Sequence, residues 1–224
     1  MEKKEAYRHM LPHFQQPGQA YFITWSLIDA LPPKALEVYT RQLRQITSSI
    51  EFARKNNNDN EALAKLKMEH SIMRRKYMKA YDDLLHLQTK FIVDLSNEQN
   101  TDIVFESLHF WEGKRLENYA ICVMNNHVHW VFKLYEKNEH DEPVYLQDIL
   151  HSVKRYSANK INKLEGLNGS LWQKESYDTT IRDDKHLFRT VEYTINNPVE
   201  ARLVKDWNDW KGTFLASGPE FRGL

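Results

Sequence analysis

The chain has 224 residues, of which 41% are hydrophobic and 12% aromatic, enough to build one buried core with an elaboration. Glycine and proline number seven each and charged residues make up 28%, which excludes a collagen-like, low-complexity or fully disordered chain. Lysine plus arginine and aspartate plus glutamate number 31 each. No overall positive field therefore points to a nucleic-acid partner, and any basic surface must be local.

The cysteine count and the hydropathy pattern indicate the cellular compartment in which we expect the protein. Cys122 is the single cysteine, which excludes an intramolecular disulfide, and the lack of a CxxC pair excludes a structural thiolate zinc site. Residues 1–18 are charged and lack the apolar core of a secretion signal or transit peptide. No run approaches the roughly 18 apolar residues of a membrane span. We expect a soluble, cytoplasmic protein with no membrane partner.

The N-terminal half predicts one strand followed by a pair of helices. Residues 20–28 are rich in β-branched and aromatic side chains, as in a strand. Apolar residues then recur at alternating spacings of three and four from Leu36 to Ala53, and again from Leu63 to Phe91, with His70 in the second series. The polar run 56–60 separates the two series. Residues 36–91 are therefore predicted to form an antiparallel helical hairpin, inserted into a single domain that spans residues 1–224.

Charge is unevenly divided between this insertion and the rest of the chain. Residues 34–92 contain 12 basic and 7 acidic side chains, so they carry +5 while the remainder carries −5. The simpler interpretation is a solvated helical face, and the more specific one is a surface that binds phosphate or a partner chain.

The C-terminal half alternates helices and strands. Ser96 and Gln99 have the spacing of a capping box at the start of a helix that ends near Gly113. Residues 119–134 are predicted to be either a tight hairpin or one long kinked strand. The later elements are an amphipathic basic helix over 145–163, a short strand over 176–181, a helix from Asp183 or Asp184 to Pro198 or slightly beyond, and an irregular tail.

Two residue pairs could carry chemistry. His127 and His129 alternate with Val128, so in a strand both imidazoles would point to one face, where a single cation could bridge them. Such a pair is also common in purely structural strands. Tyr193 and Asn197 are four residues apart and therefore share one side of the last helix, offering a hydroxyl and a neutral oxygen ligand.

Taken in order, four segments resemble the single-tyrosine HUH transposases, most closely the REP-associated tyrosine transposases. The segments are VMNNHVHWVF, SVKRYSANKIN, LWQKESYDTTIRD and VEYTINNPVEARLV. The resemblance covers residues 119–204 well and 20–28 weakly, and leaves the helical insertion unexplained. One departure stands out, because Asn125 occupies the place of the family's proline before Asn126.

The resemblance implies site residues and a reaction. His127 and His129 match the metal-binding pair, Tyr193 matches the nucleophile, and Asn197 matches the third metal ligand. The implied cofactor is Mg²⁺ or Mn²⁺, and the mixed nitrogen and oxygen set makes Mn²⁺ chemically plausible. The implied reaction cleaves and transfers single-stranded or hairpin DNA through a 5′-phosphotyrosine intermediate. Tyr177, and less so Tyr156, are rival nucleophiles.

The same resemblance suggests how DNA would be held. Candidate contacts to the DNA backbone are Lys154, Arg155, Lys160 and Lys163, and Trp172 could either stack on a base or pack in the core. A homodimer stays open, because family members differ in oligomeric state. The alternatives are a domesticated, non-catalytic DNA-binding or assembly protein and a replication or conjugation nickase. The protein would be nucleoid-associated when bound to DNA.

The order of elements indicates the fold class. With few elements and hairpin-type connections, we expect an α+β fold of the ferredoxin-like or RRM-like kind, with helices on an antiparallel sheet and the helical hairpin inserted.

Overall fold

The structure is a computed structural model that describes residues 6–8, 12–14, 16–32, 34–56, 60–87, 90–218 and 221. The chain divides into two compact units. One contains most of residues 1–30 together with 91–224, and the other is formed mainly by residues 31–90. Among the described residues, no helix is long and apolar enough to cross a bilayer.

The larger unit is built on a five-stranded antiparallel sheet. Its strands are β3 (Ala20–Ser26), β4 (Leu116–Val123), β5 (His127–Leu134), β6 (Tyr177–Thr180) and β7 (Thr213–Leu215), in the spatial order β6-β3-β5-β4-β7. Helix α3 (Glu98–His109) follows the segment 31–90 and precedes β4, and helix α4 (Leu146–Glu165) connects β5 to β6. This βαββαβ order, with β6-β3-β5-β4 as its four strands, is the ferredoxin-like arrangement, so the predicted α+β class is confirmed.

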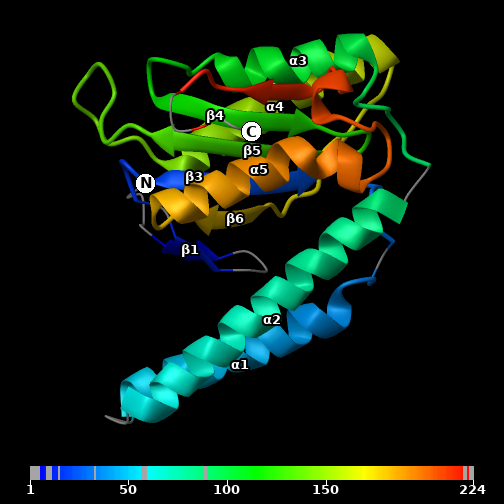
Figure 1. Cartoon of the computed structure of the whole chain (residues 1–224). Coiled ribbons are helices and arrows are strands. Elements are labelled where there is room, and N and C mark those ends of the chain that lie inside the picture. The colour runs from blue at the N-terminus through cyan, green and yellow to red at the C-terminus, as the bar shows by residue number, and fades with distance from the viewer. Residues whose placement is uncertain are drawn as a thin grey trace. The chain divides into compact units, whose positions relative to one another are not determined.

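The sheet has helices on both faces. Helix α5 (Asp184–Glu200) packs over β4 and β5 and crosses in front of the sheet in Figure 1. Helices α3 and α4 pack on each other, with the Trp111 indole donating to Ser152. On the face toward α4, the Trp25 ring makes edge contacts with Trp130 and Trp172 at centroid distances of 6.2 and 6.1 Å.

The smaller unit is the predicted helical hairpin. Helix α1 (Glu37–Asn56) and helix α2 (Asn60–Leu87) pack along their lengths, and both are visible in Figure 1. Their most buried side chains are Thr40, Leu43, Ala53, Tyr81 and Leu85. The second helix ends before Phe91. His70 on α2 is half-buried. Burial and the nearby positive charge of Arg74 lower the pKa of its imidazole.

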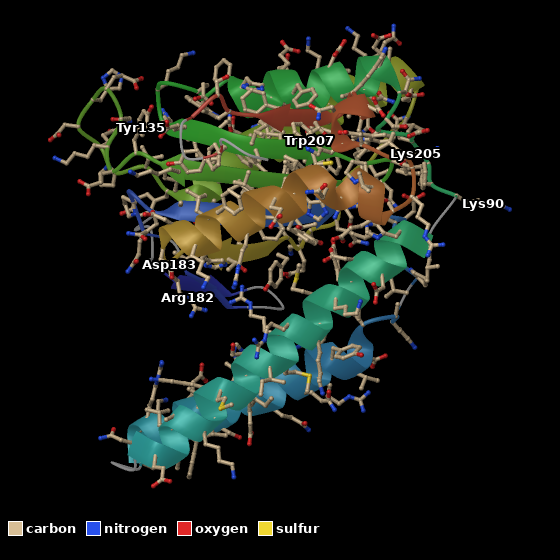
Figure 2. The ribbon with its side chains drawn as sticks, in the orientation of Figure 1. Lys90, Tyr135, Arg182, Asp183, Lys205 and Trp207 are labelled. Atoms are coloured by element: carbon tan, nitrogen blue, oxygen red, sulfur yellow. The ribbon has the colours of Figure 1, made fainter. Side chains whose placement is uncertain are left out.

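Local predictions were right about element type and less exact about ends. The segment 119–134 forms the hairpin β4–β5 rather than one kinked strand. Asp183 caps α5 by accepting from the His186 amide at 2.7 Å, and Figure 2 shows it at the N-terminal end of that helix. Helix α4 is capped after Glu165 by Gly166, whose φ of 68° is in the left-handed region that glycine tolerates.

Two expectations were wrong. The N-cap of α3 is Asn97, not Ser96, because the Asn97 side chain accepts from the Gln99 amide while the Ser96 hydroxyl donates to Asp94. The tail is not wholly irregular: after the short 3₁₀ helix η1 (Trp207–Asp209), β7 adds to the edge of β4. The leader also contains a paired ribbon, β1 (Ala6–Arg8) with β2 (Pro12–Phe14), which the polar pattern did not predict.

Candidate metal and nucleophile site

The histidine pair lies at the start of β5, directly after the β4–β5 turn. His127 and His129 are 1% and 0% exposed, and their Nε2 atoms approach to 3.1 Å. The rings are nearly perpendicular, with centroids 4.7 Å apart. Strand alternation places both side chains on the face that α5 covers, so the structure brings together the two imidazoles that the sequence singled out.

The opposite nitrogen of each ring is held by a polar neighbour. Nδ1 of His127 lies 2.7 Å from the Asn126 side-chain oxygen, and Nδ1 of His129 lies 2.8 Å from the Thr24 hydroxyl. An amide oxygen only accepts hydrogen bonds, so this contact places the His127 proton on Nδ1 and leaves a lone pair on Nε2. Two Nε2 atoms this close need a shared proton or a cation between them. Such outer hydrogen bonds are typical of histidines that ligate metals.

Hydrogen bonds hold the turn before the histidines, where Asn125 occupies the position of the family's proline. The Asn125 side chain donates to Asp94 at 3.3 Å and to the Ser96 hydroxyl at 3.2 Å, and its carbonyl accepts from the Leu95 amide. The Asn126 carbonyl accepts from the Leu27 amide at 2.9 Å. Side-chain and backbone hydrogen bonds therefore tie this turn to the segment that precedes α3 and to Leu27, which follows β3.

Helix α5 carries the tyrosine against the histidine face. The Tyr193 ring meets His129 at a centroid distance of 5.5 Å and Phe22 at 5.8 Å, in both cases edge to face. Phe22 in turn stacks on His129 at 5.7 Å. Asn197 follows one turn later on the same helix and is 0% exposed.

The histidine and Asn197 side chains are of a kind that binds divalent cations, and the two histidine Nε2 atoms face each other. The described residues include no group of three or more His, Cys, Asp or Glu side chains that could hold a metal. A third protein ligand would therefore have to be a neutral oxygen such as that of Asn197. Two imidazoles with fixed outer partners and one amide oxygen form a mixed nitrogen and oxygen set that suits Mn²⁺ better than Mg²⁺.

The rival tyrosines differ in position. Tyr177 pairs with Thr24 in the β6–β3 register, and Thr24 pairs with His129, so the Tyr177 side chain lies on the same sheet face as the histidines. Tyr156 is on α4, which packs toward the other face, and the Lys160 ammonium lies 5.4 Å from its ring centroid. A hydrogen bond to Glu106 is the main cause that raises the pKa of the Tyr156 hydroxyl. Tyr193 contacts the His129 ring and has a ligand-type residue, Asn197, one turn away on the same helix.

The predicted DNA contacts on α4 differ in exposure. Arg155, Lys160 and Lys163 are exposed. Lys154 is half-buried, and its ammonium donates to the Gln173 carbonyl at 2.8 Å, while burial lowers its pKa to about 8. Lys154 thus holds the loop before β6, where Gln173 also donates to the carbonyls of Ser26 and Ile28.

Trp172 has the environment of a core residue. It is 6% exposed, its indole donates to the Ser157 hydroxyl at 3.0 Å, and it packs against Trp25. This arrangement favours core packing over base stacking.

Three residues that support the histidine rings were not predicted as site residues. Thr24, Asn126 and Phe22 support the histidine rings, and Thr24 is 105 positions away from the histidine it orients. Only strand alternation on 20–28, combined with the correct β3–β5 register, could have indicated Thr24 and Phe22.

Comparison with known proteins gives a sequence relative and a structural neighbour. No family model matches the chain. A Haemophilus influenzae protein named "Putative REP-associated tyrosine transposase" is 26% identical over 101 residues, which are 41% of this chain and 56% of that protein. The chain therefore matches little more than half the length of this relative. The match confirms the family resemblance predicted from the motifs.

The structural neighbour is a REP-associated tyrosine transposase bound to a REP hairpin. It aligns over 95% of this chain and 82% of its own, with a TM-score of 0.44 and 16% identity.

Proposed function

We propose that this chain cuts and rejoins single-stranded DNA through a covalent bond between Tyr193 and a DNA phosphate. The observation that carries the proposal is the convergence of the His127 and His129 Nε2 atoms to 3.1 Å beside the Tyr193 ring. A purely structural histidine pair would have no need of a tyrosine on a facing helix. The sequence similarity to a protein named as a tyrosine transposase supports the same conclusion.

In this reaction the Tyr193 hydroxyl oxygen attacks phosphorus in line with the bond to the 3′ oxygen. The new bond joins the tyrosine oxygen to a 5′ phosphate, the P–O3′ bond breaks, and the 3′ oxygen leaves with a proton. An ordinary tyrosine hydroxyl has a pKa of about 10, so it loses its proton during the attack rather than before it. The phosphotyrosine ester keeps the energy of the broken bond, so a 3′ hydroxyl can reverse the step without ATP.

The chain's own residues orient the reacting groups. Asn126 and Thr24 fix the histidine rings, while Phe22 packs against both His129 and Tyr193 and so limits how the tyrosine ring moves. His127, His129 and Asn197 would hold a divalent cation, which supplies Lewis-acid polarisation of the phosphate when bound. Neutral ligands leave the full positive charge available to the phosphate.

The substrate we propose is a DNA strand that is single-stranded at the cleavage point and folded as a hairpin beside it. The solved structural neighbour is itself bound to a REP hairpin. Arg155, Lys160 and Lys163 are exposed on α4 and could bind the backbone.

The test is formation of a covalent protein–DNA adduct. The protein is incubated with Mn²⁺ and a set of labelled hairpin-containing single strands, and adducts are separated under denaturing conditions. Tyr193→Phe should lose at least about 10³-fold in adduct yield, because it lacks the nucleophile, and should bind DNA normally. Tyr177→Phe, the matched control on the same face, should form the adduct.

Two outcomes would contradict this assignment. Adduct formation by the Tyr193 variant together with its loss in the Tyr177 variant would make Tyr177 the nucleophile. DNA binding by the wild-type chain without any adduct across the substrate set would favour a non-catalytic DNA-binding protein.

A further inference from the structure

The α1–α2 hairpin concentrates positive charge in a chain that is neutral overall. Residues 34–92 carry +5, and the rest of the sequence carries −5. At distances beyond about 10 Å the whole molecule therefore presents little net field at physiological salt. A polyanion that binds this protein would gain most from contact with these two helices.

Most of the basic side chains on the two helices form no ion pair with the residues that the structure describes. Among the described residues, exposed ion pairs join Arg41 to Glu37 and Lys79 to Asp83. Seven further basic residues on the helices are exposed and form no ion pair with another described residue: Arg44, Arg54, Lys55, Lys65, Lys67, Arg75 and Lys76. These ammonium and guanidinium groups are available to an external anion.

Helical geometry arranges part of this set along one side of α2. Lys65, Arg75 and Lys76 lie within an arc of about 100° at 3.6 residues per turn, opposite the side where Tyr81 and Leu85 are buried. From Lys65 to Lys76 the helix rises about 17 Å. One DNA strand presents about five charges over that length, at one per about 3.4 Å.

The composition of the exposed surface favours nucleic acid over protein as the partner. The centre of a protein–protein interface is depleted in lysine, serine and acidic residues and enriched in aromatic side chains. The exposed positions of α1 include Gln42, Gln45, Ser48 and Ser49 between its arginines and lysines, together with the apolar Val38 and Phe52. Short polar side chains between cations suit a line of phosphates, which needs charge and hydrogen-bond donors.

We infer that the α1–α2 hairpin is a DNA-backbone-binding arm whose free basic residues, above all those of α2, contact phosphate groups. The inference rests on the proposed DNA-processing function but concerns affinity rather than cleavage. The arm would supply sequence-independent binding, while the histidine and tyrosine site would supply the chemistry.

The experiment measures the salt dependence of DNA binding. Lys65, Lys67, Arg75 and Lys76 are changed together to Gln, which keeps helix propensity nearly constant. Binding of a fluorescent hairpin with a single-stranded extension is followed between 50 and 200 mM salt. If the four residues neutralise four single-strand phosphates, the slope of log K against log salt falls in magnitude by about 3. Over that range, wild-type affinity would fall about 50-fold more than the variant's.

Two controls separate charge from structure. A charge-retaining variant, K65R/K67R/R75K/K76R, should keep the wild-type slope. A charge-matched variant in the larger unit, with Lys133, Lys137, Lys205 and Lys211 changed to Gln, should also keep it; all four are exposed, and Lys205 is labelled in Figure 2. Circular dichroism establishes that each variant retains its helices.

The outcomes are distinguishable. Equal slopes in the Gln variant and the wild type would contradict the inference that the hairpin binds DNA. Loss of self-association in sedimentation, with DNA binding unchanged, would also contradict it and would make a second copy of the chain the partner. A reduced slope without any Tyr193 adduct would support the arm while contradicting the proposed cleavage.

Discussion

At the scale of single residues, the closeness of the two histidine rings makes the site sensitive to what lies between them. Each Nδ1 is held by a neighbour, so the two Nε2 atoms face each other at 3.1 Å with little freedom to turn away. A cation there would replace a shared proton. Metal binding should therefore release a proton and weaken as pH falls.

Removing a ligand should show directly in metal affinity. His127→Ala and His129→Ala should each lower Mn²⁺ affinity by more than about 100-fold, since even outer-shell changes cost 10–100-fold. Asn197→Ala should cost less, because water can replace one neutral oxygen. Isothermal titration calorimetry of the folded variants measures all three. Unchanged affinity in both histidine variants would remove the metal from the proposal.

Thr24 provides a finer comparison. Thr24→Val keeps the shape of the side chain but removes the hydroxyl that contacts Nδ1 of His129. We expect a loss of about 10–100-fold in Mn²⁺ affinity by the same titration. Thr179→Val, at a half-buried position of β6 on the same face, is the matched control and should bind Mn²⁺ normally.

The stability of a Trp172 variant distinguishes core packing from base stacking as the role of this residue. Trp172→Ala should lower the free energy of unfolding by about 3–5 kcal/mol, because it leaves a cavity beside Trp25 and removes the bond to Ser157. Urea denaturation measures the change, and Trp207→Ala, at a half-buried position of η1, should cost clearly less. Full stability with weakened DNA binding would instead support base stacking.

Sequence reasoning reached the ligand types but not their supports. Alternation in 127–129 and the helical spacing of Tyr193 and Asn197 are local patterns, so they could be read without a structure. The contacts of Thr24 and Phe22 depend on β3–β5 register, which joins segments more than 100 positions apart. The N-cap of α3 was misplaced by one residue because both Ser96 and Asn97 are good caps.

At the scale of elements, the attachment of β7 depends on one glycine. A Cβ on Gly212 would collide with the Val123 carbonyl and lie 2.7 Å from the Trp210 indole nitrogen. That indole donates to the same carbonyl at 2.9 Å, and the Val123 amide donates to the Gly212 carbonyl at 2.8 Å. Close backbone contact here joins the tail to the edge of the sheet.

Gly212→Ala should therefore destabilise the protein by about 1–3 kcal/mol, the usual cost of overpacking. Thermal unfolding and hydrogen exchange of the β4 amides measure the change. The control is Lys211→Ala, at the exposed neighbouring position. A substitution at another glycine, Gly169, would be a poor control, because its φ of 94° would strain any other residue. A Gly212→Ala protein as stable as the wild type would show that the tail tolerates displacement.

The short C-terminal strand was missed for a physical reason. Thr213–Leu215 is too short to show alternation, and its three residues are each half-buried. It becomes a strand because β4 offers an unpaired edge, which is a property of the assembled sheet. The longer elements, α4 and α5 above all, carry enough apolar periodicity to be predicted from local sequence.

At the scale of the whole molecule, the candidate catalytic residues and the candidate DNA-binding helices belong to different units. His127, His129, Tyr193 and Asn197 all belong to the larger unit, and residues 31–90 belong to the smaller one. The sequence predicts the two helices, because apolar residues recur at helical spacing from Leu36 to Ala53 and again from Leu63 to Phe91. It could not define the hairpin's role, because exposed charge suits both solvent and a partner.

Replacing residues 40–88 by a short glycine-serine linker should preserve Mn²⁺ binding and cleavage of a minimal substrate. Affinity for longer DNA should fall, because the free basic residues of α1 and α2 are removed. Calorimetry with Mn²⁺ and the adduct assay measure the two properties separately. Loss of Mn²⁺ binding in a folded truncated protein would place part of the hairpin in the active site.

The buried Cys122 can serve as a built-in probe of how fast the sheet opens. Its thiol lies on β4 directly opposite His129, contacts the Met124 sulfur at 3.5 Å, and has a pKa raised to about 12 by burial. In the closed protein at pH 8 it is neither ionised nor reachable, so an alkylating reagent can modify it only when the strands part. As the only cysteine in the sequence, it reports the rate of that opening without an engineered label. A ligand that bridges the histidines should lengthen the alkylation half-life.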